Sequence, residues 1–215
     1  MVEMSWNDVR YVCNLVSEPV LPVPASPADK LTLYSQRNPL WAGLSYAAGI
    51  TFSAAGCLVV ALAMLVTLVY NERIEPPEVA KRLRDAYCFI GSLLSRPSQI
   101  PIAFPRLKWD GVLHYRDKPA DMAVVAREVA ENGAVIAEVA FDRARPVYLR
   151  LNGIDYWNQH FVLVTRVVGS DVEIADPWTG ELVMLTGSRY FKAGWPKEAS
   201  RAITGLRLVG RSTTY

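Results

Sequence analysis

The sequence predicts an α+β domain in which a buried helix packs against a twisted antiparallel sheet. Three observations lead to this prediction. Residues 54–70 are apolar almost throughout, which indicates a helix surrounded by protein on every side. A β-rich run over residues 160–176 contains a Gly-Ser turn signal and predicts an antiparallel hairpin. Residues 184–210 have the pattern of a strand, a loop and a final strand.

Composition argues against several classes of protein. The chain has 215 residues, of which 51% are hydrophobic and 20% charged, as expected of a globular protein rather than a disordered one. Its 23 Lys and Arg residues nearly balance its 21 Asp and Glu residues and form no cluster, which argues against a nucleic acid partner. The three cysteines lack metal-ligand spacing, so neither a metal nor another cofactor is expected.

The first 30 residues are expected to form an N-terminal arm, followed by a compact domain at residues 31–215. The arm contains the stretch EPVLPVPASPADK, whose four prolines favour a stiff, extended connector. Charged residues are scattered through the first twenty positions, which does not fit a secretory signal peptide. A cytoplasmic or phage-associated location is therefore favoured.

The apolar run allows two interpretations. Residues 54–70 reach the lower limit of about 17 residues for a membrane span. The interpretation we favour is a core helix that begins at Cys57 or the residue before it, is capped by Thr51 or Ser53, and ends at Asn71.

The other elements follow in order along the chain. Residues 76–87 begin with two prolines and carry mixed charges, as expected of a surface helix. Residues 88–115 are rich in proline and aromatic residues and predict short helical turns and an irregular strand. Residues 120–133 have apolar residues at helical spacing and end in Asn-Gly, and residues 134–142 predict a strand.

Cys57 stands where the core helix is expected to begin. A thiol at a helix N-terminus is close to unpaired N–H groups and to the positive end of the helix dipole, which favour the thiolate and an adjacent oxyanion. The alternative is that Cys57 is simply a small buried apolar residue. Cys88 and His114 have no partner at catalytic or metal spacing, and structural roles are favoured for both.

His160 enters the first strand of the predicted hairpin and Asp176 leaves the second. Both positions lie at the same edge of a hairpin, so the imidazole and the carboxylate can meet there. A two-residue turn at Gly169 and Ser170 places residue 163 opposite Asp176, however, which puts His160 on the other face. A longer turn, a bulge or a twist of the chain at Asp176 is therefore required.

Cysteine, histidine and aspartate together have a defined chemistry. The imidazole converts the thiol into a nucleophile, and the carboxylate fixes the tautomer of the imidazole and stabilises its protonated form. Three blocks in the same order, YSQRNPLWAG, GITFSAAGCLVVALAML and HFVLVTRVVGSDVEIADPWTG, resemble the double-glycine leader peptidase-like branch of the papain-like cysteine peptidases. The resemblance implies a papain-like fold with Cys57 as nucleophile, His160 as general base and acid, and Asp176 as the orienting carboxylate.

The resemblance also implies supporting residues. Gln36 is the candidate side-chain donor of the oxyanion hole, because Thr51 stands where papain-like enzymes usually have that glutamine. Trp178 is the candidate shield of the histidine and aspartate from water, or an ordinary core residue. Many relatives have Gly-Pro after the cysteine, whereas this chain has Leu58 and Val59, which either crowd the substrate subsites or fill the core.

Three functions of different classes follow from the sequence. The favoured one is a cysteine peptidase or related amide hydrolase that forms a thioester acyl-enzyme. Its substrate is a peptide or protein, such as a leader peptide or a peptidoglycan stem peptide. The alternatives are an inactive papain-like domain that serves as a binding or structural module, and a single-span membrane protein.

Overall fold

The computed structural model describes residues 30–91, 93–115, 118–140, 149–151, 154–156, 159–190 and 198–212. These residues form a mixed helix and sheet structure, which confirms the predicted α+β class. All but the last residue of the expected N-terminal arm, including Cys13, lies outside the described residues. The boundary between the arm and the domain therefore stays a prediction.

The centre of the fold is a six-stranded antiparallel sheet with the strand order β3-β10-β4-β7-β8-β9. Its strands are β3 (Leu107–His114), β4 (Val135–Ala140), β7 (Gln159–Val168), β8 (Asp171–Asp176), β9 (Glu181–Met184) and β10 (Ile203–Arg211). Two small strand pairs lie outside it: β1 (Ser45–Ala47) with β2 (Ile50–Thr51), and β5 (Leu149–Leu151) with β6 (Ile154–Tyr156).

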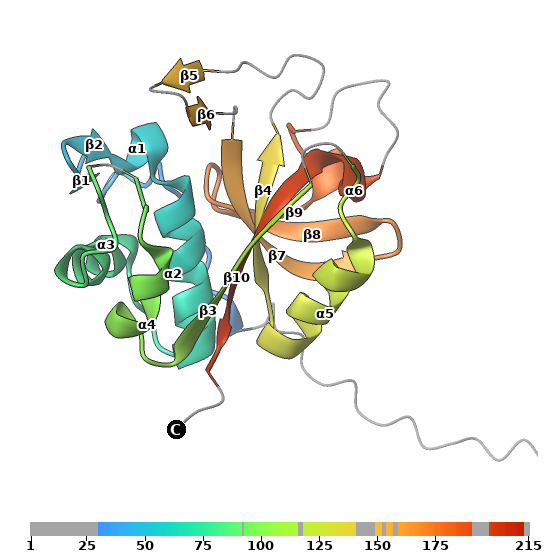
Figure 1. Ribbon diagram of the computed structural model, residues 1–215, viewed down its shortest axis with the longest axis horizontal. Coiled ribbons are helices and arrows are strands. Elements are labelled where there is room, and N and C mark those ends of the chain that lie inside the picture. Colours follow the sequence, from blue (N-terminus) through green and yellow to red (C-terminus); the bar gives the residue numbers. More distant parts are fainter. Residues whose placement is uncertain are drawn as a thin grey trace, which may run out of the picture.

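The helices fall into two groups on either side of the sheet (Figure 1). The first group is α1 (Phe52–Ala55), α2 (Cys57–Tyr70), α3 (Pro76–Asp85) and α4 (Ile100–Ala103), with the 3-10 turn η2 (Pro97–Gln99) before α4. The second is α5 (Met122–Asn132) and α6 (Ala199–Ala202), and a further 3-10 turn, η3 (Leu185–Gly187), follows β9. The predicted surface helix, the helix ending at Asn-Gly and the short turns before β3 are all confirmed. The short helix α6 is an addition that the sequence pattern does not indicate.

The central helix α2 runs from Cys57 to Tyr70 and ends at Asn71, as predicted. Asn71 adopts the left-handed conformation, with φ of 52°, which asparagine tolerates better than most residues. The prediction that Thr51 or Ser53 caps this helix is wrong. These two residues belong to the start of the separate short helix α1, and the N-cap of α2 is Gly56, which has no capping side chain.

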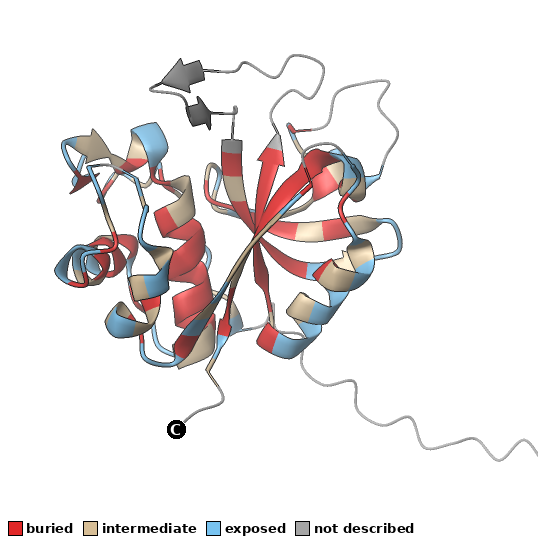
Figure 2. Ribbon diagram, in the orientation of Figure 1, coloured by how far each residue is buried: buried red, intermediate tan, exposed pale blue. Residues whose placement is uncertain are grey.

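The side chains of α2 are buried along most of its length (Figure 2). Residues Val59 to Leu68 of α2 are all buried, and α2 packs against α3, β4 and β7. This packing explains why the helix is apolar on every face. A second core lies on the other side of the sheet, where α5 packs against β4, β7 and β10. In the part of the chain that the structure describes, no helix is both long and apolar enough to cross a membrane.

Truncation of the central helix should destabilise the fold strongly. Leu65 is fully buried in α2, so we expect Leu65→Ala to lower the free energy of unfolding by about 2 to 5 kcal/mol through lost burial and an unfilled cavity. Leu40→Ala is the matched control, because the same atoms are removed from a side chain that is 75% exposed. Urea denaturation of both variants measures the difference. Equal losses in the two variants would contradict the central position of α2.

Candidate active site

Cys57 is the first residue of α2, directly after Gly56. Gly56 donates its N–H to the Phe52 carbonyl oxygen at 2.8 Å, and a Cβ at this position would lie 2.6 Å from that oxygen. Only glycine allows this close passage from α1 into α2. The thiol of Cys57 is free and half-buried, whereas that of Cys88 is fully buried, and burial raises the pKa of Cys88 to about 11. The two thiols therefore lie in different environments.

The predicted hairpin is present, and its register solves the difficulty raised by its turn. Val168 pairs with Asp171 across the two-residue turn, but between Val164 and Arg166 the register shifts because Thr165 is an extra residue in β7. Such a bulge moves every later residue by one position and so exchanges the two faces of the strand. His160 and Asp176 thereby come to share one face.

The imidazole of His160 meets the carboxylate of Asp176 at the end of the hairpin. His160 Nε2 lies 2.8 Å from Asp176 Oδ1, and both side chains are buried, with relative exposures of 2% and 3%. Burial lowers the pKa of His160, but hydrogen bonds to Asp176 and to Cys57 and the charges of both groups outweigh it and raise this pKa to about 8. The three residues therefore form one hydrogen-bonded chain in the order Cys57, His160, Asp176.

Asp176 receives three hydrogen bonds. Its Oδ1 accepts from the His160 ring and from the backbone N–H of Trp178 at 2.8 Å, and its Oδ2 accepts from the Tyr190 hydroxyl at 2.8 Å. Burial raises the pKa of this carboxyl, but the hydrogen bonds and the charge of His160 outweigh it and lower the pKa below its ordinary value. The carboxylate is thus held in its charged form and in a fixed orientation.

Gln36 lies between the hairpin and the start of the helix. Its backbone N–H donates to the Pro177 carbonyl oxygen at 2.6 Å, and its side-chain Nε2 donates to the Ser53 carbonyl oxygen at 3.2 Å. The side chain belongs to a residue that is 2% exposed, and its Oε1 has no hydrogen-bond partner. The candidate oxyanion donor is therefore fixed four residues before Cys57, and its amide has a second N–H.

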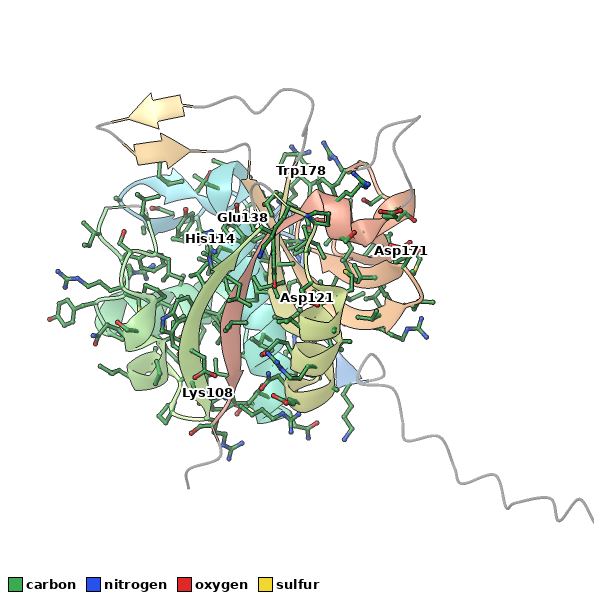
Figure 3. The ribbon with its side chains drawn as sticks, turned by 45° about the vertical axis from the view of Figure 1, so that its right-hand side comes forward. Lys108, His114, Asp121, Glu138, Asp171 and Trp178 are labelled. Atoms are coloured by element: carbon green, nitrogen blue, oxygen red, sulfur yellow. The ribbon has the colours of Figure 1, made fainter. Side chains whose placement is uncertain are left out.

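Trp178 stands beside the histidine at one end of the molecule (Figure 3). Its ring makes an edge contact with the His160 ring, with 6.5 Å between centroids. The guanidinium of Arg37 lies 3.7 Å from the Trp178 ring centroid and that of Arg189 lies 4.9 Å from it. Cations over an indole ring stabilise its position. This placement fits the predicted shielding role better than that of an ordinary core residue, because Trp178 is only half-buried.

Two tyrosines near the site are not indicated by the sequence. Tyr190 stacks on His160, with ring centroids 5.0 Å apart, and burial and the charge of Asp176 raise its pKa well above its usual range. Tyr46 donates to the Ala55 carbonyl oxygen at 3.2 Å, and burial and the charge of Cys57 raise its pKa to about 12. Both phenols therefore remain protonated. Neither lies at a motif spacing from the cysteine or histidine, so only the folded chain brings them to the site.

The two residues after the cysteine have different positions. Val59 is 2% exposed and belongs to the core around α2, whereas Leu58 is half-buried and lines a cavity between α2 and the sheet. Within the described part of the chain, no group of three or more Cys, His, Asp or Glu residues could hold a metal ion. Comparison with protein-family models, with curated proteins and with solved structures finds no match to this chain.

Proposed function

We propose that this protein is a cysteine peptidase or a related amide hydrolase with a papain-like arrangement of its site. The observation that supports this most directly is the hydrogen-bonded chain of Cys57, His160 and Asp176. Its members come from the start of a buried helix and from the two ends of a hairpin more than 100 residues later. A buried histidine that is tied to both a thiol and a carboxylate is an arrangement that nucleophilic catalysis requires and that packing alone does not.

The reaction begins with a proton transfer from the thiol of Cys57 to the imidazole of His160. The raised pKa of His160, about 8, means that the imidazolium is the main form of this ring at neutral pH. The thiolate attacks the carbonyl carbon of a substrate amide and forms a C–S bond, and the carbonyl oxygen becomes an oxyanion. The imidazolium then gives its proton to the leaving nitrogen as the C–N bond breaks. Water, activated by the neutral His160, hydrolyses the thioester that remains.

The oxyanion needs donors close to the sulfur. The backbone N–H of Cys57 lies at the first position of α2, where intrahelical acceptors are absent, and it is the first donor. The second is the N–H of the Gln36 amide that does not bond Ser53. Two such donors in a site protected from water contribute strongly to catalysis, because removal of one typically costs about 10²-fold to 10³-fold in rate.

The substrate class is a peptide or protein, which includes leader peptides and peptidoglycan stem peptides. The alternative, an inactive papain-like binding module, has the same fold and differs in the chemistry of the sulfur. In an inactive module Cys57 behaves as an ordinary thiol. Its reactivity therefore separates the two functions before any substrate is known.

Iodoacetamide alkylation tests the proposed pairing of Cys57 with His160. We expect Cys57 to be labelled at pH 6 at least about tenfold faster than Cys13 or Cys88, because a thiolate stabilised by an imidazolium persists below the ordinary thiol range. His160→Gln is the matched variant, and we expect it to slow the labelling of Cys57 by about tenfold or more. Mass spectrometry of the digested protein assigns each rate to its residue. Equal labelling of Cys57 in the two proteins would favour the inactive module.

A further inference from the structure

A cavity of about 250 Å³ lies between α2 and the sheet, against the residue that follows Cys57. Leu58 and Leu62, one turn apart on α2, form one wall. The opposite wall belongs to the sheet and includes Trp109 and Val112 of β3, Ile136 of β4 and Val209 of β10. The surface of this cavity close to the reactive sulfur is therefore largely apolar.

The sheet wall depends on a bulge in β3. Trp109 and Val112 are three residues apart and would face opposite sides of a regular strand. In β3, however, Leu208 of β10 pairs with Gly111 and Val209 pairs with Trp109, so Asp110 is an extra residue. Gly111 has a φ of 114°, which side chains rarely allow. The bulge turns both Trp109 and Val112 toward the cavity.

The charged group in the cavity wall is already neutralised by the protein. Arg207 forms an ion pair with Glu138, with 2.9 Å between Nη2 and Oε2, and its guanidinium lies 5.0 Å from the ring centroid of Phe161. The Glu138 side chain is only 2% exposed and also accepts from Thr204 Oγ1 at 3.2 Å. His114, at the end of β3 nearer to Trp178, is exposed and stands at the rim (Figure 3). A second carboxylate in the cavity would disturb a pair that is already balanced.

We propose that this cavity binds a large apolar side chain of a peptide substrate, of the leucine, isoleucine, methionine or phenylalanine class, on a residue close to the scissile bond. Leu58 is then a specificity-determining residue, which gives its bulk after the cysteine a function other than core packing. This inference rests on the proposed function in one respect: the position of the bound side chain relative to the scissile bond requires Cys57 to be the nucleophile.

Two variants fill the cavity from opposite walls. Leu58→Trp adds bulk from α2, and Val112→Trp adds bulk from β3, so that misfolding of one leaves the other to decide. Val168→Trp is the matched control, because Val168 is 44% exposed at the turn of the β7-β8 hairpin. Thermal unfolding of all three variants reports whether each one is folded.

The first measurement is cleavage of a library of fluorescence-quenched hexapeptides. We expect one position near the cleaved bond to favour leucine over glycine by about tenfold to a hundredfold, which corresponds to burial of one large apolar side chain. This ratio should fall at least tenfold in Leu58→Trp and Val112→Trp and stay unchanged in Val168→Trp. Cleavage without an apolar preference, or with a preference for glutamate or aspartate, would overturn the cavity assignment and leave the proposed catalytic function intact.

The second measurement does not depend on catalysis. Binding of hexaalanine and of hexaalanine with one leucine is compared on Cys57→Ala protein by calorimetry. We expect the leucine peptide to bind at least tenfold tighter, and the added Leu58→Trp change to remove this gain. If the library is not cleaved but this gain is present and lost as described, the catalytic proposal fails and the cavity remains an apolar peptide site. Equal binding of the two peptides would refute the cavity assignment.

Discussion

Cys57→Ala is expected to reduce amide hydrolysis by about 10⁴-fold or more, to the level of the uncatalysed reaction with the same peptide. The reason is that alanine has no atom that can form the thioester, while His160 and Asp176 keep their mutual hydrogen bond. Digestion of a peptide library by both proteins, with products identified by mass spectrometry, measures the change. Since all cleavage by the wild type passes through Cys57, every product should disappear together.

The matched control is Cys88→Ala. Cys88 is the other free cysteine among the described residues, and it is fully buried beside the first group of helices. Its pKa, raised to about 11 by burial, keeps it an inert thiol at neutral pH. We expect this variant to keep the full activity of the wild type with a modest loss of stability. Hydrolysis that persists in Cys57→Ala would show that the catalytic assignment is wrong.

The central helix is the part of the fold that the sequence predicts best. Its apolar residues have no polar side that could face water, and Asn71 marks its end, so both its burial and its C-terminus follow from local pattern. The start is harder to predict. Thr51 and Ser53 are good capping residues by type, but the chain makes the separate helix α1 there, and its close passage at Gly56 depends on packing against Phe52.

The register of the β7-β8 hairpin illustrates how far a local pattern can be used. The turn at Gly169 and Ser170 predicts the pairing next to it, which the structure confirms. The same turn gives the wrong face for His160 unless an irregularity lies between. The sequence demands such an irregularity but does not locate it, because Thr165 is an ordinary strand residue. Its position is set by tertiary contacts, in which Thr165 donates to the carboxylate and the carbonyl of Glu173.

The residues of the site that the sequence misses are those held by long-range contacts alone. Tyr190 follows Asp176 by 14 residues and lies in the segment after η3, where no pattern indicates a contact with the carboxylate. Leu58 is a similar case. Beside Val59 in an apolar helix it carries no signal of its own, and only the cavity next to it separates the exposed side of the pair from the buried one.

Asp176→Asn is expected to lower hydrolysis by about 10² to 10⁴-fold while the fold is kept. Asparagine can still accept from the His160 ring and the Trp178 N–H through its oxygen, but it has no charge to stabilise the imidazolium. Asp171→Asn is the control on the same strand. Asp171 lies at the other end of β8 and accepts hydrogen bonds from the backbone of Val172 and from Thr186, away from Cys57. Its rate should equal that of the wild type.

The same variant has a distinct effect on stability against pH. In the wild type the pKa of His160 is about 8, above its ordinary 6.5, so protonation of His160 stabilises the fold fully below pH 6.5, and this contribution is lost as the pH rises through 8. Removal of the Asp176 charge lowers the pKa of His160 toward or below its ordinary value, because burial then opposes protonation with less compensation. The free energy of unfolding, measured in urea at several values between pH 6 and 9, should therefore fall across this range in the wild type and in Asp171→Asn. In Asp176→Asn the fall should be smaller or absent. A fall of equal size in all three proteins would mean that the Asp176 carboxylate does not support the imidazolium, and the role of this residue as the orienting group would then be wrong.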